Sequence, residues 1–378
     1  MGGTGEARGG LVVTRIKRPR NLLGPRRAIA MGLAGLVVLL VVAGVAAAAR
    51  GPVRTAAQRG AAHQGMSTVL TDVSFTDASH GWIAGQAGYV LRTSDGGATW
   101  TKTTMSGRVN LSSVSFADST HGFASGVWWT TENIGKAGPL LFSTSDGGAT
   151  WNKSRLLPGV NGMMDHVVAI DADTACAVGA ASEIEHYGVV VRTTNGGSSW
   201  QTQLKQSGRR TTVLTGVDFV DADTGWASGY DAHTGHGVVL ATSDGGATWR
   251  KQATPQSAWI LQIDFADAQH GWASAYKSVL RTTDGGATWV KVAVVHGPDQ
   301  DIEDVSFFDV EHGWAVGNSG TIWATSDGGA TWTAQTSGVK TGLLAACFVS
   351  AQQGWVVGED NVVLKTTDGG ATWVGSGP

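Results

Sequence analysis

The carboxylates that could do chemistry in this sequence recur in one short turn. The turn first reads Ser94-Asp95-Gly96-Gly97-Ala98-Thr99-Trp100, and six related copies follow it along the chain. Carboxylates can ligate metal ions or act as acids and bases, but here each one belongs to a separate repeat. An Asp or Asn in such a turn can bond its own backbone, and the adjacent glycines accept positive φ. We therefore interpret these side chains as structural, at Asp95, Asp146, Asn195, Asp244, Asp284, Asp327 and Asp368.

Histidines also recur at one fixed position, in the first half of four repeats. Imidazoles are common metal ligands, but histidines in separate repeats cannot converge on one ion. We expect neither a metal site nor a cofactor from this set, which is His80, His121, His270 and His312.

The spacing of the Asp-Gly-Gly turns indicates the architecture that positions them. They lie 40 to 51 residues apart, which is the spacing of a four-stranded propeller blade. A second pattern precedes each turn, first seen from Val73 to Trp82, in which apolar and polar residues alternate as in a half-buried strand. A second strand follows it, a third leads into the turn, and a fourth begins at the closing Trp. The sequence therefore predicts an all-β fold over residues 68–378, a seven-bladed β-propeller of four-stranded antiparallel blades.

The N-terminal region differs from the repeats in charge and hydropathy. Residues 1–60 hold ten Lys and Arg residues and one acid, whereas the rest of the chain is acidic overall. Residues 28–49 are small or apolar and uncharged, and as a helix they would span about 33 Å, enough for a bilayer core. We predict a basic cytoplasmic segment at 1–27, a single transmembrane anchor at 28–49, a linker at 50–67 and an extracytoplasmic propeller. A cleaved signal peptide, which would leave the propeller secreted, is the alternative.

The two cysteines, Cys176 and Cys347, fall in repeats three and seven, which do not adjoin in a ring of seven. We therefore expect two free thiols rather than a disulfide. Two ways of closing the ring are compatible with the sequence: side-chain packing of blade seven on blade one, or an extra edge strand from residues 60–68.

Repeats two, three and four are longer than the others between their second and third strands. Insertions confined to one face of a repeat array often mark a binding face. The link before repeat three, which carries Asp165 and His166, is expected to reach the same face. Aromatic and Arg side chains suit protein recognition, although ordinary solvated loops remain the alternative. The candidate partner-binding residues are Trp128, Trp129, His186, Tyr187, Arg209, Arg210, Tyr230 and His233.

The Asp-Gly-Gly turn is an Asp box, and its pairing with strands such as His312-Gly-Trp-Ala-Val-Gly317 resembles the photosystem II assembly and stability factor family. The resemblance covers residues 68–375. It implies a non-enzymatic factor beyond a membrane that binds a membrane protein, or an assembly intermediate of one, during assembly or repair. It also implies an arginine-rich patch, for which the adjacent pair Arg209 and Arg210 is the candidate. The chain departs from the family in having a transmembrane anchor and no lipid-accepting cysteine.

The rival hypothesis is a glycoside hydrolase of the sialidase type, or a carbohydrate-binding receptor module, on the same fold. Tyr187 beside Glu185 is the one pair with suggestive chemistry, since sialidases use a Tyr nucleophile with a Glu partner. The Phe/Tyr-Arg-Ile-Pro sequence of sialidases is missing, and a small-molecule substrate is therefore not expected. A mildly acidic propeller without a basic stripe is also a poor candidate for binding nucleic acid.

Overall fold

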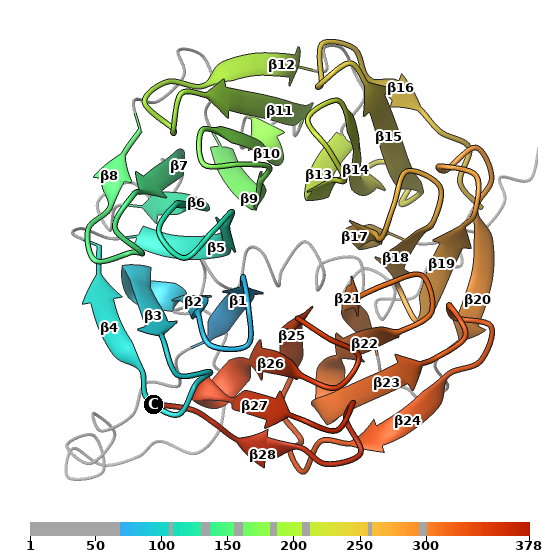
Figure 1. Ribbon diagram of the computed structural model, residues 1–378. Coiled ribbons are helices and arrows are strands. Elements are labelled where there is room, and N and C mark those ends of the chain that lie inside the picture. The colour runs from blue at the N-terminus through green and yellow to red at the C-terminus, as the bar shows by residue number, and fades with distance from the viewer. Residues whose placement is uncertain are drawn as a thin grey trace, which may run out of the picture. The chain divides into compact units, whose positions relative to one another are not determined.

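The computed structural model describes residues 69–378, apart from 106–108, 130–136, 155–161, 182–186, 206–211, 256–258 and 295–300. Within this part of the chain, seven four-stranded antiparallel sheets follow one another around a ring (Figure 1). The predicted seven-bladed propeller with four strands in each blade is therefore confirmed. None of the described helices is long and apolar enough to cross a membrane, and residues 28–49 lie outside the described part.

Each blade is built from four consecutive strands. Blade one holds β1 (Leu70–Phe75), β2 (Gly81–Gly85), β3 (Tyr89–Thr93) and β4 (Thr101–Thr104), and blade two holds β5 (Val109–Phe116), β6 (Gly122–Trp129), β7 (Ala137–Thr144) and β8 (Asn152–Lys153). Blade three holds β9 (Gly162–Ala169), β10 (Thr174–Ala181), β11 (Tyr187–Thr194) and β12 (Gln201–Lys205), and blade four holds β13 (Thr212–Phe219), β14 (Thr224–Asp231), β15 (Gly237–Ser243) and β16 (Arg250–Lys251).

The last three blades keep the same order. Blade five holds β17 (Ile260–Phe265), β18 (Gly271–Ala275), β19 (Ser278–Thr282) and β20 (Val290–Val294), and blade six holds β21 (Ile302–Phe307), β22 (Gly313–Gly317), β23 (Thr321–Thr325) and β24 (Thr333–Thr336). Blade seven holds β25 (Leu343–Phe348), β26 (Gly354–Gly358), β27 (Val363–Thr366) and β28 (Val374–Gly375). The first strand of every blade lies nearest the ring centre and the fourth lies outermost (Figure 1).

The start of each second strand shows why the repeat needs a glycine there. Phe75 pairs with Gly81, and a Cβ on that glycine would lie 2.2 Å from the Phe75 ring. Five other blades repeat this Phe–Gly pair. Blade three has Ala169 in place of the phenylalanine, and there the glycine position is occupied by Ala175. The glycine is therefore required by the aromatic ring across from it.

The blades are held to one another by one recurring aromatic contact. The Trp82 indole of blade one stacks on Phe116 of blade two, with ring centroids 3.6 Å apart and planes within 5°. Its Nε1 donates a hydrogen bond of 2.9 Å to the Gly147 carbonyl in the Asp-Gly-Gly turn of blade two. Stacked aromatic pairs contribute about 0.5–1.5 kcal/mol beyond the area they bury. The same contact joins four further blade pairs, through Trp226 on Phe265, Trp272 on Phe307, Trp314 on Phe348 and Trp355 on Phe75.

The ring closes through this same contact rather than through an exchanged strand. All four strands of blade seven come from the C-terminal end of the chain. Trp355 stacks on Phe75 with centroids 3.5 Å apart, and both Trp355 Nε1 and Lys365 Nζ donate to the Gly96 carbonyl. Ser376, just beyond β28, accepts from Trp100 Nε1 at 2.7 Å and donates to the Gly97 carbonyl at 2.6 Å. Among the described residues, side-chain packing therefore closes the ring, and residues 60–68 are not part of the described chain.

Both cysteines are free thiols, as expected. Cys176 is buried at the position that a tryptophan occupies in five other blades. The Cys347 sulfur accepts a hydrogen bond of 3.3 Å from the Phe75 backbone amide, so it too lies at the contact between blades seven and one. Burial raises the pKa of each thiol to about 12, which keeps both protonated and unreactive.

Trp355 offers a test of the closing contact. Trp355→Ala should lower the free energy of unfolding by about 3–5 kcal/mol, because it removes a buried aromatic ring. Trp355→Phe keeps a ring for stacking but loses the hydrogen bond to Gly96 and part of the buried indole, so its cost should be smaller, about 1–3 kcal/mol. Phe123 already occupies this position in blade two. Urea unfolding of both variants would measure the difference, and equal losses would contradict a closure that depends on stacking.

Candidate functional site

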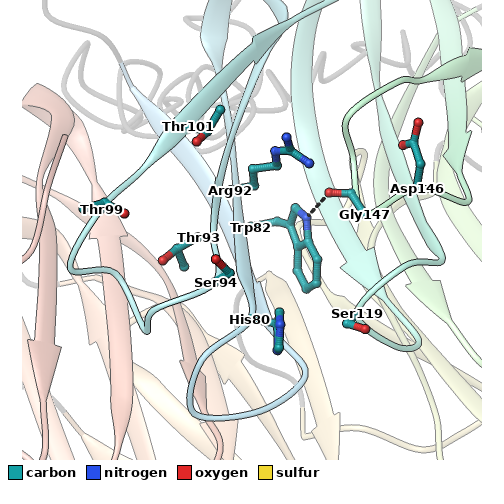
Figure 2. A pocket seen from close by; sticks show the side chains of 10 residues that line it. All are labelled: His80, Trp82, Arg92, Thr93, Ser94, Thr99, Thr101, Ser119, Asp146 and Gly147. Carbon is teal, nitrogen blue, oxygen red and sulfur yellow. Dashed lines mark hydrogen bonds between the residues drawn. The ribbon is translucent and has the colours of Figure 1, made fainter.

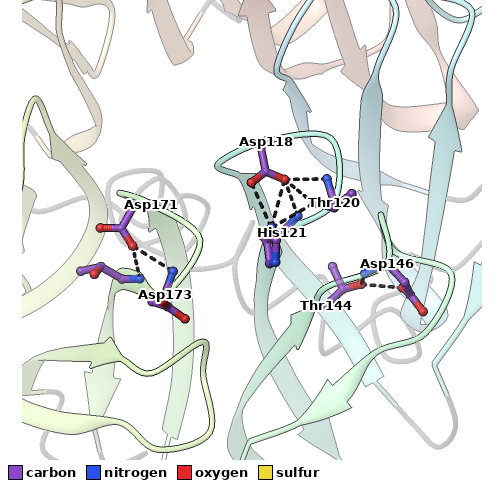
Figure 3. Close-up of polar contacts among 8 residues, drawn as sticks. Asp118, Thr120, His121, Thr144, Asp146, Asp171 and Asp173 are labelled. Atoms are coloured by element: carbon purple, nitrogen blue, oxygen red, sulfur yellow. Dashed lines mark hydrogen bonds and ion pairs between the residues drawn. The ribbon is translucent and has the colours of Figure 1, made fainter.

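The carboxylates of the Asp-Gly-Gly turns accept hydrogen bonds from residues of their own turns. Asp95 Oδ1 accepts from the Thr99 amide at 2.9 Å and from the Thr93 hydroxyl at 2.7 Å, and Thr99 Oγ1 donates to Oδ2 at 2.6 Å. The hydroxyl and amide of Thr99 lower the pKa of Asp95 to about 2. The Thr144–Asp146 contact in Figure 3 belongs to the same arrangement in blade two. These acids stay ionised at neutral pH, and their lone pairs are used locally.

The four repeated histidines pair with aspartates of the same turn. His121 Nδ1 lies 2.9 Å from Asp118 Oδ2, and Asp118 Oδ1 also accepts from the amides of Thr120 and His121 (Figure 3). His80, His270 and His312 make the equivalent contact in their own blades. In the described part of the chain, no group of three or more His, Cys, Asp or Glu residues could hold a metal ion.

The connections between strands divide the propeller into two faces. We call the face that carries the Asp-Gly-Gly turns, together with the turns between first and second strands, the turn face. The opposite face carries the hairpin connections between second and third strands, and we call it the hairpin face. The second strands β6, β10 and β14 have eight residues each, whereas β2 has five. Blades two to four therefore extend further on the hairpin face.

Three candidate residues take part in contacts on the hairpin face. Tyr187 begins β11 half-buried, with the Lys205 ammonium 5.3 Å from its ring centroid. Tyr230 is 8% exposed and stacks on Trp259, with ring centroids 4.5 Å apart. Trp128 packs partly buried against the core between blades one and two. Cation–π and stacked pairs of this kind present rigid apolar surface beside a charge.

For the remaining candidates, the structure gives either the position in a strand or connection alone or no description. His233 lies in the exposed connection after β14, where its amide donates to Asp231 Oδ1 at 2.9 Å. Trp129 is the last residue of β6. His186, Arg209 and Arg210 lie outside the described residues, as does Glu185 of the pair proposed for a sialidase. Trp259 was not among the candidates, and its only signal in the sequence was that it falls outside the repeated tryptophan positions.

A set of buried carboxylates joins the inner strands, and sequence reasoning missed it. Asp72 Oδ2 accepts from the Val114 amide of the next blade at 2.9 Å, and Asp218 and Asp304 make the same contact to Phe265 and Ala346. Burial raises the pKa of Asp218 to about 6 and that of Asp304 to about 8. Such raised values often mark catalytic acids, but here each carboxylate oxygen that reaches the next blade accepts a backbone amide.

Asp165 differs from these carboxylates because neither of its oxygens has a hydrogen-bond partner among the described residues. The sequence analysis placed Asp165 in a link between blades, but β9 begins at Gly162 and includes it. Asp165 is the extra residue where the pairing of β9 and β10 shifts register. Burial raises its pKa to about 7, and burial together with the nearby Asp165 raises the pKa of Tyr230 to about 12.

Third-strand bases also serve the contacts between blades. Arg192 donates to the Gly245 and Ala222 carbonyls of blade four, and Lys365 donates to the Gly96 carbonyl of blade one. Arg92 occupies the same position in blade one, where it lines a polar pocket of about 290 Å³ and points toward Gly147 of blade two (Figure 2).

The sequence profile of the photosynthesis system II assembly factor YCF48 matches residues 55–212 and 293–375 of this chain. These segments make up more than half of its length. The chain belongs to the YCF48 family of photosystem II assembly factors. The resemblance inferred from the Asp boxes and their companion strands is thereby confirmed.

Two characterised relatives carry the same family name or role. The photosystem II stability/assembly factor HCF136 of Arabidopsis thaliana is 25% identical over 280 residues, which span 70% of this chain and 67% of the relative. The photosystem II assembly lipoprotein Ycf48 of Synechococcus sp. (strain CC9902) is 32% identical over 136 residues, or 35% of this chain. That match spans only 36% of the Synechococcus protein.

Solved structures share the fold. A YCF48 bound to a D1 peptide superposes with a TM-score of 0.62 at 21% identity, covering 80% of this chain and 93% of that one. The GH74 xyloglucanase of Xanthomonas campestris gives a TM-score of 0.63 at 12% identity, covering 83% of this chain and 55% of the enzyme. At these identities both likenesses concern the fold alone, and this fold serves enzymes as well as assembly factors.

Asp165 generates a prediction about pH. Its counterparts Thr71 and Thr215 donate their hydroxyls to the next blade, to the carbonyls of Leu111 and Ile260. Only a protonated Asp165 can donate in this way. Because its folded pKa is raised above the ordinary value of 3.8, its stabilising contribution is complete at low pH and is lost as the pH rises through 7.

Asp165→Thr should therefore raise the free energy of unfolding at pH 8 while changing it little at pH 4. The difference between variant and wild type should grow by roughly 2–4 kcal/mol over that range. Urea unfolding at several pH values measures it, with the exposed Glu311→Gln as the control carboxylate. A difference that does not change with pH would contradict the prediction.

Proposed function

We propose that this chain is a non-enzymatic scaffold that binds a membrane protein while that protein is being assembled. Membership of the YCF48 family is the observation that carries the proposal. A YCF48 has been seen bound to a D1 peptide, and the relatives are named as photosystem II assembly or stability factors. We therefore infer that the partner is a membrane protein of the D1 kind, bound through an extended segment.

We propose the hairpin face of blades two to four as the surface that binds this partner. Tyr187 and Lys205 supply a paired aromatic and basic group on blade three, and Tyr230 of blade four is buried against the half-buried Trp259 at the edge of this surface. Aromatic anchors that are already packed lose little conformational freedom on binding, which favours affinity. Trp128, Trp129, His186, Arg209, Arg210 and His233 complete the proposed surface.

Binding without catalysis agrees with the chemistry of the described carboxylates. The acids of the Asp-Gly-Gly turns are held by their own turns, and Asp72, Asp218 and Asp304 accept backbone amides of the next blade. A glycosidase needs two carboxyl groups free to face one glycosidic bond. In the described part of the chain these acids accept hydrogen bonds within their own turns or from the next blade, and Asp165, which does not, is buried.

We further propose that residues 28–49 anchor the chain, with residues 1–27 in the cytoplasm, a linker at 50–67 and the propeller on the far side of the membrane. The length and apolarity of 28–49 and the basic residues before it support this arrangement. Mass spectrometry of the mature chain distinguishes the anchor from a cleaved signal peptide. A mature N-terminus after residue 49 would overturn the anchor and make the propeller a secreted domain.

The partner surface can be tested with overlapping synthetic peptides of D1 and the full chain. At least one peptide should bind, and Tyr187→Ala with Lys205→Ala should weaken it by about tenfold, or about 1.4 kcal/mol. Fluorescence anisotropy measures the peptide affinity. Crosslinked pull-down from membranes shows whether the same double variant also weakens binding of the intact partner protein.

Blade five provides a matched control for this experiment. Lys277 lies 5.5 Å from the Tyr276 ring centroid, a similar pair on the same face but beside a short hairpin. Tyr276→Ala with Lys277→Ala should leave the peptide affinity unchanged. Equal losses in the two double variants would argue against the proposed surface, and the absence of any bound peptide would argue against the proposed partner.

A further inference from the structure

The inner turns of the turn face are rich in acidic residues. The seven turns between first and second strands are all described, and they contain nine carboxylates and no Lys or Arg. Their acids are Asp77, Asp118, Asp171, Asp173, Asp221, Asp223, Asp267, Asp309 and Glu311. The six aspartates of the Asp-Gly-Gly turns lie on the same face. Arg192 and Lys365 also reach turns of this face, where they donate to backbone carbonyls, but acids outnumber bases there. A surface with an excess of one charge attracts segments of the opposite sign and steers their approach.

This charge persists below neutral pH. The amides of Thr224 and Asp223 lower the pKa of Asp221. Burial raises the pKa of Asp77, but hydrogen bonds from His80 and Ser79 outweigh it, and the net direction is down. Asp309 follows the same pattern. These carboxylates are consequently ionised over the range in which proteins function.

A pocket lined by aromatic and polar residues opens on this face, where blades six, seven and one meet. Its volume is about 490 Å³, and it is lined by Phe75, Thr76, Ala78, Phe308, Phe348 and Val349 together with Asp77, Ser350 and Gln353. The Thr76 hydroxyl on its wall has no hydrogen-bond partner. A pocket of this size accommodates one or two large side chains.

Phe308, which lines this pocket, differs from the residues at the same position in other blades. The residues at its position in blades three to five are Ile170, Val220 and Ala266, and each packs against a core cluster. Phe308 is larger than any of them, yet its side chain is 46% exposed, and Val310 two residues later is 39% exposed. Phe308 thus leaves the packed position of its counterparts and lines the pocket with an exposed aromatic ring.

We propose that this pocket receives an apolar anchor side chain of a partner protein whose flanking residues are Lys or Arg. Flanking bases match the surrounding carboxylates, and the anchor fills the space between Phe308, Phe348 and Phe75. The same face of a second copy carries the same charge, so a symmetric self-contact is disfavoured. An anionic membrane surface would be repelled for the same reason. This site is separate from the hairpin face and would serve a second partner or a second segment of the same one.

The test uses the full chain and a labelled peptide, Gly-Lys-Arg-Leu-Phe-Lys-Arg-Gly, with fluorescence anisotropy as the readout. The peptide should bind, and its affinity should fall as salt rises from 50 to 300 mM, because the attraction is screened. Replacing every base by Glu, or Leu-Phe by Gly-Ser, should lower the affinity at least tenfold.

Variants locate the site. Phe308→Ser should weaken the peptide at least tenfold, whereas Val290→Ser should not, although Val290 is 56% exposed on the outer strand β20. Glu311→Lys reverses one exposed charge and leaves the residues that line the pocket unchanged, so it should also weaken binding. It provides a second test in case Phe308→Ser folds poorly.

Several results would overturn the proposal. Among them are equal affinity for the acidic peptide, equal effects of Phe308→Ser and Val290→Ser, and self-association of the chain that Phe308→Ser abolishes in sedimentation velocity. Tyr187→Ala with Lys205→Ala should leave this peptide unaffected. Failure here and failure of the hairpin-face proposal are thus told apart.

Discussion

The structure depends on the fact that no blade can bury both faces of its own sheet. Five of the seven blades therefore place a tryptophan of the second strand on a phenylalanine of the next blade, as Trp82 does on Phe116, and tie the indole to a carbonyl in the neighbour's turn. That carbonyl is available only because two successive glycines with positive φ shape the turn, as Gly147 and Gly148 do. The contact between blades therefore depends on the shape of the Asp-Gly-Gly turn.

This arrangement also explains why so many polar groups in the propeller are engaged in hydrogen bonds. A turn must have a fixed shape to present its carbonyl, and the Asp95 carboxylate fixes it through hydrogen bonds from both atoms of Thr99. Nearer the ring centre, Asp72 reaches an amide of the next blade and repeats the principle with a buried charge. Burying an ionised group is unfavourable unless it is hydrogen-bonded, and this raises its pKa without giving it a catalytic task.

The fold could be predicted from the sequence because its signals are local and repeated seven times. Even blade three, which lacks both the phenylalanine and the tryptophan, kept its Asn195 turn and could be counted. The candidate site was harder to predict because its determinants are not local. Asp165 depends on a register shift in β9 that no spacing revealed, and the Trp259–Tyr230 stack joins blades four and five. The role of Ser376 in closing the ring depends on residues more than 270 positions away.

Function in such a protein is expected where the repeat is broken, since equivalent positions in seven blades cannot all be binding sites. On the hairpin face the break is the lengthening of β6, β10 and β14, which raises one side of the ring above the other. On the turn face the break is Phe308, where a small packed residue of other blades has become a large exposed one. The two departures lie in different blades and on opposite faces, and they differ in chemistry, with paired aromatic and basic groups on one and a pocket lined by aromatic and polar residues among acids on the other. A propeller that carries both could hold two segments at once without either competing for the blade contacts that keep the ring closed.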